Sequence, residues 1–143
     1  MATTTRATLR QRLSEAIGDY HSVTSTSAGN SAATTIISTT LLDLPGGGDD
    51  DAFEGWYVMV TSGNNDTEIR RISSYIANDS TVTVGRAFSN ATEPEVTFEV
   101  HRYDPTHKHN AINRAIEELS KHVPQMIRDE TIIVDNLTSN GDF

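Results

Sequence analysis

Residues 56–84 read WYVMVTSGNNDTEIRRISSYIANDSTVTV, and the spacing of the apolar side chains in this stretch decides the fold class. Apolar residues alternate with other side chains in segments 56–60 and 81–84, while residues 62–66 and 77–80 have the composition of tight turns. A period of two is typical of a strand with one face in a core and one face in water. The stretch therefore predicts antiparallel strands joined by short polar turns.

The same alternation continues on both sides of this stretch. In segment 95–100, the apolar set Val96, Phe98 and Val100 is predicted to face the core, and the intervening set Glu95, Thr97 and Glu99 is predicted to face water. In segment 68–76, Ile72 and Ile76 are in phase, which places them on the same face of the predicted strand. Five or six short strands of this kind predict a small barrel or sandwich rather than a parallel sheet.

Two amphipathic segments bracket the strands. Thr3, Thr4 and Thr5 can cap a helix that Gly18 then ends. Asp104-Pro105 is a helix start, with an N-cap acceptor followed by proline at the first helical position. Each helix carries an apolar stripe, and we expect the stripes to pack together: Leu9, Leu13 and Ile17 against Ile112, Ile116 and Leu119. The opposite face of the first helix carries Arg6, Arg10, Gln11 and Ser14.

The chain of 143 residues is expected to be one α+β domain, in which a small antiparallel β-barrel or sandwich is inserted between N- and C-terminal helices. The predicted parts are a helix in residues 1–20, a β-module in 21–103, a helix in 104–128 and an extended tail in 129–143.

The tail contains Thr131–Leu137, a strand-forming segment in which Ile132, Ile133, Val134 and Leu137 are apolar and acidic residues flank the run. We predict that this segment adds as an edge strand to a partner protein. The alternative is that it folds back as one more strand of its own β-module.

The net charge of −9 is uneven along the chain. Residues 21–103 hold eleven acids against four arginines, whereas residues 104–128 hold four basic residues against three acids. Proteins that bind nucleic acid without sequence preference neutralise phosphates with Lys and Arg, so this composition argues against that class. The absence of cysteine excludes disulfides and thiolate chemistry. Neither a signal peptide nor a bilayer-spanning segment is evident, and we expect a soluble protein assembled inside a cell.

Several groups of residues carry side chains of the kinds that metal, catalytic or ligand sites use. The acidic loop 46–54 has the oxygen ligands that calcium prefers, but its spacing differs from an EF-hand and favours a flexible, solvated loop. His107 and His109 are two residues apart at a helix start, a poor spacing for chelation. Trp56 is interpreted as a core anchor, with ligand stacking as the alternative. We predict no catalytic, metal-binding or cofactor-binding residue.

Five short motifs bear on function because together they resemble part of a known protein family. They are Gly55-Trp56, Ser62-Gly63, Glu68-Ile69-Arg70-Arg71-Ile72, Thr81-Val82-Thr83-Val84 and Ala87-Phe88. In this order they resemble a β-module that recurs in structural proteins of tailed viruses of bacteria or archaea. The flanking helices resemble those of the head–tail connector (adaptor, or neck) proteins of these viruses.

The resemblance implies a structural protein of the virion neck, assembled in the host cytoplasm, without catalytic residues. It implies a ring, commonly of twelve copies, between the portal protein and the tail or tail-terminator proteins, through which DNA passes without specific binding. It also implies that a C-terminal segment grips the portal. The alternative function is a carbohydrate- or receptor-binding β-module of a fibre or a capsid decoration protein.

Overall fold

The computed structural model describes residues 5–122 and contains two α-helices and six strands in these residues. Helix α1 (Arg6–Ala16) precedes all the strands, and helix α2 (Pro105–His122) follows them. The chain divides into two compact units. The first ends at Ile112 and holds α1, the strands and the start of α2, and the second begins at Asn113. Within the described residues, neither helix has the length and apolar character needed to cross a membrane.

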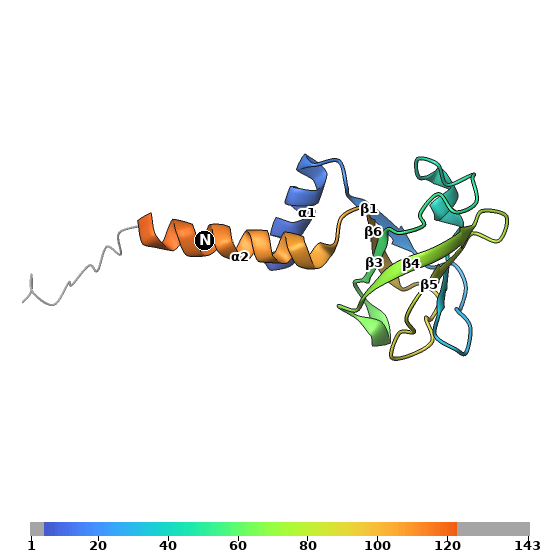
Figure 1. Cartoon of the computed structure of the whole chain (residues 1–143). Coiled ribbons are helices and arrows are strands. Elements are labelled where there is room, and N and C mark those ends of the chain that lie inside the picture. The colour runs from blue at the N-terminus through green and yellow to red at the C-terminus, as the bar shows by residue number, and fades with distance from the viewer. Residues whose placement is uncertain (1–4, 123–143) are drawn as a thin grey trace, which may run out of the picture. The chain divides into compact units, whose positions relative to one another are not determined.

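The strands form one antiparallel sheet in the order β1-β6-β3-β4-β5-β2 (Figure 1). Their bounds are β1 (His21–Thr24), β2 (Thr35–Ile37), β3 (Tyr57–Val60), β4 (Ile69–Ile76), β5 (Thr81–Val84) and β6 (Thr97–His101). Short 3-10 turns, η1 (Thr39–Asp43) and η2 (Gly63–Asn65), lie in the connections. The predicted α+β class and the antiparallel pairing of short strands are confirmed.

The sheet is curled into a half-barrel because its two edges are tied to each other. Ser27, which follows β1, forms an antiparallel bridge with Ile37 of β2. The amide of Thr26 donates to the carbonyl of Ile37 at 2.9 Å, and the hydroxyl of Ser38 donates to the carbonyl of Thr24 at 2.6 Å. Closing a sheet in this way leaves less unpaired backbone at the edges.

The apolar core lies on one face of the curled sheet. Its fully buried members come from the strands and from the long connection between β2 and β3: Ile36, Leu41, Phe53, Val58, Val60, Val82, Phe98 and Val100. Phe53 packs between two aromatic neighbours, 5.4 Å from the ring of Trp56 and 4.8 Å from that of Tyr75. The predicted inward positions of segments 56–60, 81–84 and 95–100 are confirmed by these residues.

Strand β4 departs from the expected alternation. The pairing of β4 with β5 shifts register between Ile72 and Ser74, which is a β-bulge or irregularity. One extra residue reverses the side that all later side chains face. Ile72 therefore remains buried and Tyr75 is 1% exposed, whereas Ile76 is 44% exposed. The prediction that Ile72 and Ile76 lie on the same face of the strand is wrong for this reason.

The acidic connection 46–54 was expected to be a flexible, solvated loop, but it is bonded to the end of β4. Carboxylate oxygens of Asp51 and Asp50 accept hydrogen bonds from the amides of Tyr75 and Ala77, at 3.2 and 2.8 Å. The buried hydroxyl of Tyr75 donates to the carbonyl of Gly47 at 2.7 Å. These carboxylates thus satisfy backbone donors that lie beyond the part of β4 that pairs with β3.

Both predicted helix starts are confirmed. The hydroxyl of Thr5 accepts a hydrogen bond from the amide of Thr8, and the carboxylate of Asp104 accepts one from the amide of Thr106. After α1, Gly18 has φ +68, the left-handed conformation expected of a residue that ends a helix.

The bulge can be tested with two isoleucines of the same strand. We expect Ile72→Ala to lower the free energy of unfolding by about 2–5 kcal/mol, because it empties a buried site. Ile76→Ala should lower it by less than about 1 kcal/mol, because that side chain is largely in solvent. Urea unfolding of both variants measures the difference. Equal losses would show that both side chains are buried and that the bulge is absent.

Candidate functional site

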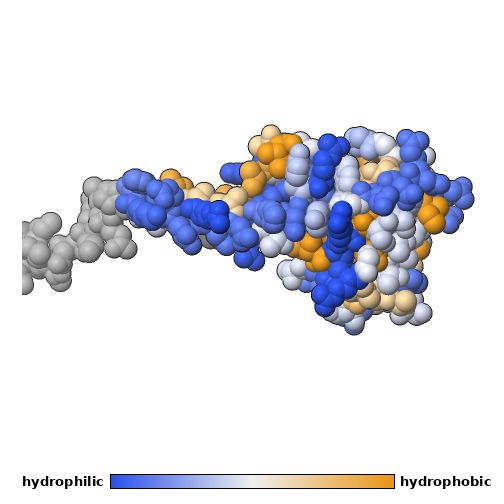
Figure 2. Space-filling model, viewed as in Figure 1, coloured by the Kyte–Doolittle hydropathy of each residue, from blue (hydrophilic) through white to orange (hydrophobic). Residues whose placement is uncertain are grey.

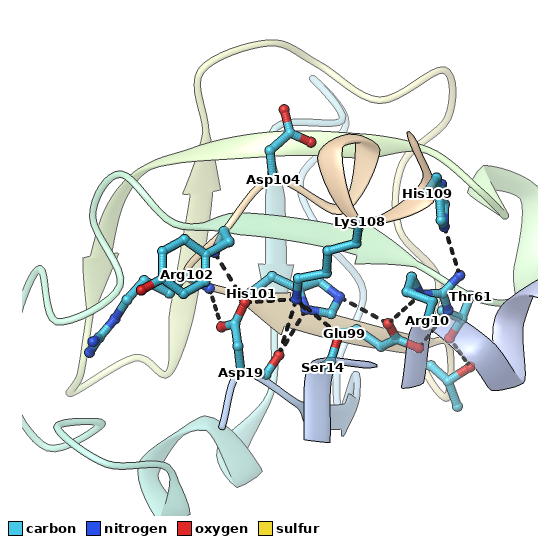
Figure 3. Close-up of polar contacts among 12 residues, drawn as sticks. Arg10, Ser14, Asp19, Thr61, Glu99, His101, Arg102, Asp104, Lys108 and His109 are labelled. Carbon is cyan, nitrogen blue, oxygen red and sulfur yellow. Dashed lines mark hydrogen bonds and ion pairs between the residues drawn. The ribbon is translucent and has the colours of Figure 1, made fainter. Parts of the chain in front are cut away.

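Six polar side chains are buried together where α1, β6 and the first turn of α2 meet (Figure 3). We name this group the polar cluster: Arg10, Ser14, Asp19, Glu99, His101 and Lys108, each at most 5% exposed. Charged residues are almost never buried to this degree unless they are paired. The cluster lies on the face of β6 opposite to the apolar core, so helices cover the face that was expected to be in water.

Arg10 and Glu99 form the pair that attaches α1 to the sheet. Nε of Arg10 donates to Oε2 of Glu99 at 3.0 Å, and Nη2 donates to Oε1 at 2.7 Å. This two-bond geometry matches the planar guanidinium to the planar carboxylate. Arg10 and Ser14 are four residues apart and share a helix face, and that face points toward the sheet. The face of α1 opposite its apolar stripe is therefore buried at both positions.

His101 connects the Glu99 carboxylate to Lys108. Its Nε2 is 2.9 Å from Oε2 of Glu99, and its Nδ1 is 3.0 Å from Nζ of Lys108. Nδ1 also lies 3.1 Å from the backbone carbonyl oxygen of Asp19. Both ring nitrogens of His101 therefore have polar partners inside the cluster.

Lys108 and Asp19 form the second ion pair of the cluster. Nζ of Lys108 donates to Oδ2 of Asp19 at 2.7 Å and to the hydroxyl of Ser14 at 2.9 Å. The carboxylate of Asp19 also accepts from the backbone amides of Arg102 and Tyr103. Asp19 thereby fixes the turn between β6 and α2 against the segment that follows α1 (Figure 3).

The acid groups are held ionised despite their burial. Burial by itself would raise the pKa of Glu99, but hydrogen bonds from His101 and Arg10 and the charge of Arg10 outweigh it and lower the pKa from 4.5 to about 2. Burial likewise opposes the ionisation of Asp19, but the bond from Lys108 and those from two amides lower its pKa. At the margin of the cluster, burial and then the charge of Arg10 lower the pKa of His109.

A histidine beside a carboxylate and a lysine has the composition of an acid–base catalyst. In this cluster, however, His101 is 0% exposed and both of its ring nitrogens are occupied by other side chains. What the arrangement provides is orientation, because satisfied buried charges fix the positions of α1 and the start of α2 on the sheet.

The predicted apolar packing between helices is only partly present within a single chain. Leu9 and Leu13 are half-buried and Ile112 is buried. The other three stripe residues, Ile17, Ile116 and Leu119, are 48, 51 and 62% exposed, so their predicted burial is not seen. Polar bonds link α1 to the first turns of α2 instead, including one between Arg10 and His109 at 3.3 Å.

A hollow of about 190 Å³ lies beside the polar cluster. We name it the Trp56 hollow, and the residues that line it include Ile17, His21, Trp56, Arg102 and Tyr103. The guanidinium of Arg102 is 5.0 Å from the centre of the Trp56 ring, and His21 stacks on that ring at 6.2 Å. Trp56 also packs against the apolar core, in agreement with its interpretation as an anchor.

The remaining sequence candidates do not assemble into a site in the part of the chain that is described. Among residues 5–122, no group of three or more His, Asp and Glu side chains has the arrangement of a metal site. The predicted partner-binding residues Ile132, Ile133, Val134 and Leu137 lie outside the described residues. The polar cluster was missed, because its members are spread from Arg10 to Lys108 in the sequence.

Comparison of the chain with protein-family models, with curated proteins and with solved structures finds no match.

The depressed pKa of Glu99 makes the stability of the fold depend on pH. Its contribution is fully present above about pH 4.5 and is lost as the pH falls toward 2, because the unfolded chain then binds a proton that the folded chain does not. A shift of this size corresponds to roughly 3 kcal/mol. We expect Glu99→Gln to lower the free energy of unfolding at pH 7 by about 3–5 kcal/mol and to flatten its decline in acid.

The control is Glu54→Gln, because Glu54 is exposed and has no ion-pair partner within residues 5–122. Urea unfolding between pH 2 and 7 should give this variant the same slope as the parent chain. A Glu99→Gln variant that also keeps the parental slope would rule out the assigned ionisation of Glu99.

Proposed function

We propose that this protein is a structural subunit of the virion neck of a tailed virus, a head–tail connector that forms a ring between portal and tail and lines the DNA exit channel. The order of α1, six strands and α2 supports the proposal, since it agrees with a β-module inserted between two helices. The proposal keeps the partners implied by the resemblance: the portal protein, tail or tail-terminator proteins, and further copies of this chain.

The observation that carries the proposal is the polar cluster. It is buried, fully bonded and placed where both helices meet the sheet, so it supplies rigidity instead of a reactive surface. A subunit between two assemblies has to keep its helices and its β-module in a fixed relation while neighbours bind to them. Paired charges in a low-dielectric interior hold one geometry, because any other leaves a charge unpaired.

The surface charge of the β-module supports the proposed channel role. Of the eleven acids in residues 21–103, nine are exposed, while Glu68 is half-buried and Glu99 is buried. One face of the molecule is largely hydrophilic, with small separate apolar spots (Figure 2). A wall with this charge repels phosphates, which favours the passage of DNA over its retention.

The carbohydrate-binding alternative receives less support. Sugar recognition by tryptophan requires an accessible ring face, whereas the Trp56 ring already has His21, Phe53 and Arg102 as close neighbours. The proposed neck function is therefore preferred.

The neck proposal is tested with the portal protein encoded in the same genome. We expect the full chain to co-sediment with purified portal and to appear as a closed ring on it by electron microscopy. A chain lacking residues 129–143 should keep its melting temperature but lose portal binding, because the predicted docking strand is removed. A chain lacking only residues 139–143 is the control and should bind normally.

Two results would contradict this proposal. Failure of the full chain to bind portal at micromolar concentration would count against the neck function. Unfolding of the chain that lacks residues 129–143 would show that the tail belongs to its own β-module and would overturn the docking prediction.

The exposed acids of residues 21–103 also lead to a prediction about binding of free DNA. We expect no gel shift of a double-stranded fragment at micromolar protein and low salt, because the exposed acids repel phosphates. Replacing the exposed Asp49, Glu54 and Asp66 with lysine should produce salt-sensitive binding if surface charge alone prevents it. A shift with the parent chain at low salt would exclude the repelling surface.

A further inference from the structure

The Trp56 hollow holds a positive charge on a protein that is mostly acidic. Arg102 is exposed, and its guanidinium has no carboxylate partner within residues 5–122. The side chain extends away from the polar cluster (Figure 3), and the guanidinium lies over the Trp56 ring, 5.0 Å from its centre. This cation–π contact fixes the position of the guanidinium. The planar N–H donors of an arginine held in this way suit a carboxylate, which can accept two parallel hydrogen bonds.

The nearest acid does not neutralise Arg102. The carboxylate of Asp19 also lines the hollow, but it accepts from Nζ of Lys108 and from the amides of Arg102 and Tyr103. Burial lowers the pKa of His21, and nearby positive charges, including those of Arg102 and Lys108, lower it further, although Asp19 opposes them. The hollow is therefore short of negative charge, unlike the exposed acidic surface of the β-module.

The size and lining of the hollow favour a protein side chain over a larger ligand. Its volume of about 190 Å³ is below the roughly 300–1,000 Å³ that is typical of small-molecule sites. At the rim, Ile17 and Tyr103 are 48 and 57% exposed, so an apolar surface continues beyond the hollow. Tryptophan, tyrosine and arginine are also the residues that most often dominate binding energy at protein interfaces. An acidic residue with apolar neighbours fits all these features.

We propose that the Trp56 hollow binds an acidic residue of a partner protein in which the neighbouring residues are apolar. The partner's carboxylate accepts hydrogen bonds from the guanidinium of Arg102, and its apolar neighbours pack against Ile17 and Tyr103 at the rim. An ion pair in a partly enclosed place is screened less by salt than one on an open surface. The site is independent of the proposed neck function, because it requires neither a portal nor a ring.

Trp56 makes binding measurable at the site itself, because it is the sole tryptophan of the chain. The probes are two short peptides with blocked ends, one with glutamate between two leucines and one with glutamine in its place. The glutamate peptide should shift the single indole N–H resonance of the full chain, with a dissociation constant of about 0.1–10 mM. The glutamine peptide should bind roughly tenfold more weakly, because it lacks the charge. Equal binding of the two peptides, or no shift with either, would overturn the proposal.

Two arginine variants separate the hollow from general effects of charge. Arg102→Gln should weaken binding of the glutamate peptide by roughly tenfold. Arg86→Gln is the matched control and should bind like the parent chain, because Arg86 is exposed, has no carboxylate partner within residues 5–122 and does not line the hollow. Both substitutions are on the surface, so both melting temperatures should stay near the parental value. Parental binding by Arg102→Gln, or an equal loss in both variants, would contradict the assigned contact.

His21 provides an independent check through pH. A carboxylate bound beside Arg102 should raise the pKa of His21, which lies below the usual 6.5 in the free chain. The other groups that act on the charge of His21 are Asp19, His101, Arg102 and Lys108. Because binding takes up a proton, the affinity for the glutamate peptide should rise as the pH falls from 7 toward 5, where glutamate, with a pKa of about 4.3, is still largely ionised. His21→Gln should flatten this dependence, and a parent chain without it would show that the carboxylate binds elsewhere.

Other occupants of the hollow give different results. If a second copy of the chain fills it, the Trp56 resonance should shift with protein concentration alone. If residues 129–143 fill it, their deletion should shift the resonance before any peptide is added. If the hollow is a nucleic-acid site, a short oligonucleotide should shift the resonance at lower concentrations than the glutamate peptide does. Each of these three results would overturn the proposal.

Discussion

Glu99 carries a negative charge on the face of the sheet that the helices cover, and this charge constrains the rest of the structure. A buried carboxylate is costly unless cationic or hydrogen-bonding donors reach it. Arg10 supplies two bonds from α1, and His101 supplies one from the same strand. Because Nδ1 of His101 lies 3.0 Å from Nζ of Lys108, these contacts extend to the first turn of α2. The placement of α1 and of the start of α2 is thus determined by directional bonds, which are far less tolerant of sliding than apolar contacts.

The strands and the helix ends could be predicted because their signals are local. Alternation in segments 56–60 and 81–84, the cap at Asp104 and the turn at Gly18 each depend on a few neighbouring residues. The bulge in β4 could not be predicted this way, since it depends on how β4 pairs with β5. The bulge buries Tyr75 and exposes Ile76, and the buried hydroxyl of Tyr75 donates a hydrogen bond to the acidic connection.

The polar cluster escaped prediction for a different reason. Glu99 alternates with Phe98 and Val100, and this pattern normally means a face in water. Only the tertiary structure shows that a helix covers that face with its polar side. A weak signal was present: Glu99 and His101 share one side of a strand, and Arg10 and Ser14 share one side of a helix. Such a polar face on a strand and on a helix fits two outcomes: the two faces can be buried against each other, or each can be exposed to solvent. The sequence pattern alone does not distinguish these outcomes.

Exposed acids and buried ion pairs respond differently to the solvent. The acids of the β-module sit in water, where salt within a Debye length screens their repulsion. The cluster excludes water, so its pairs keep their strength when salt rises. Added salt therefore weakens the repulsion between the exposed acids much more than it weakens the buried ion pairs of the cluster.

The tied edges of the curled sheet have a consequence for how copies of the chain behave at high local concentration. Open strand edges invite other chains to add strands, which is a common start of disordered aggregation. Here β1 and β2 are only four and three residues long, and the bridge between Ser27 and Ile37 links the chain beside them. Little backbone is left as a template, so ordered encounters through side chains face less competition from misassembly.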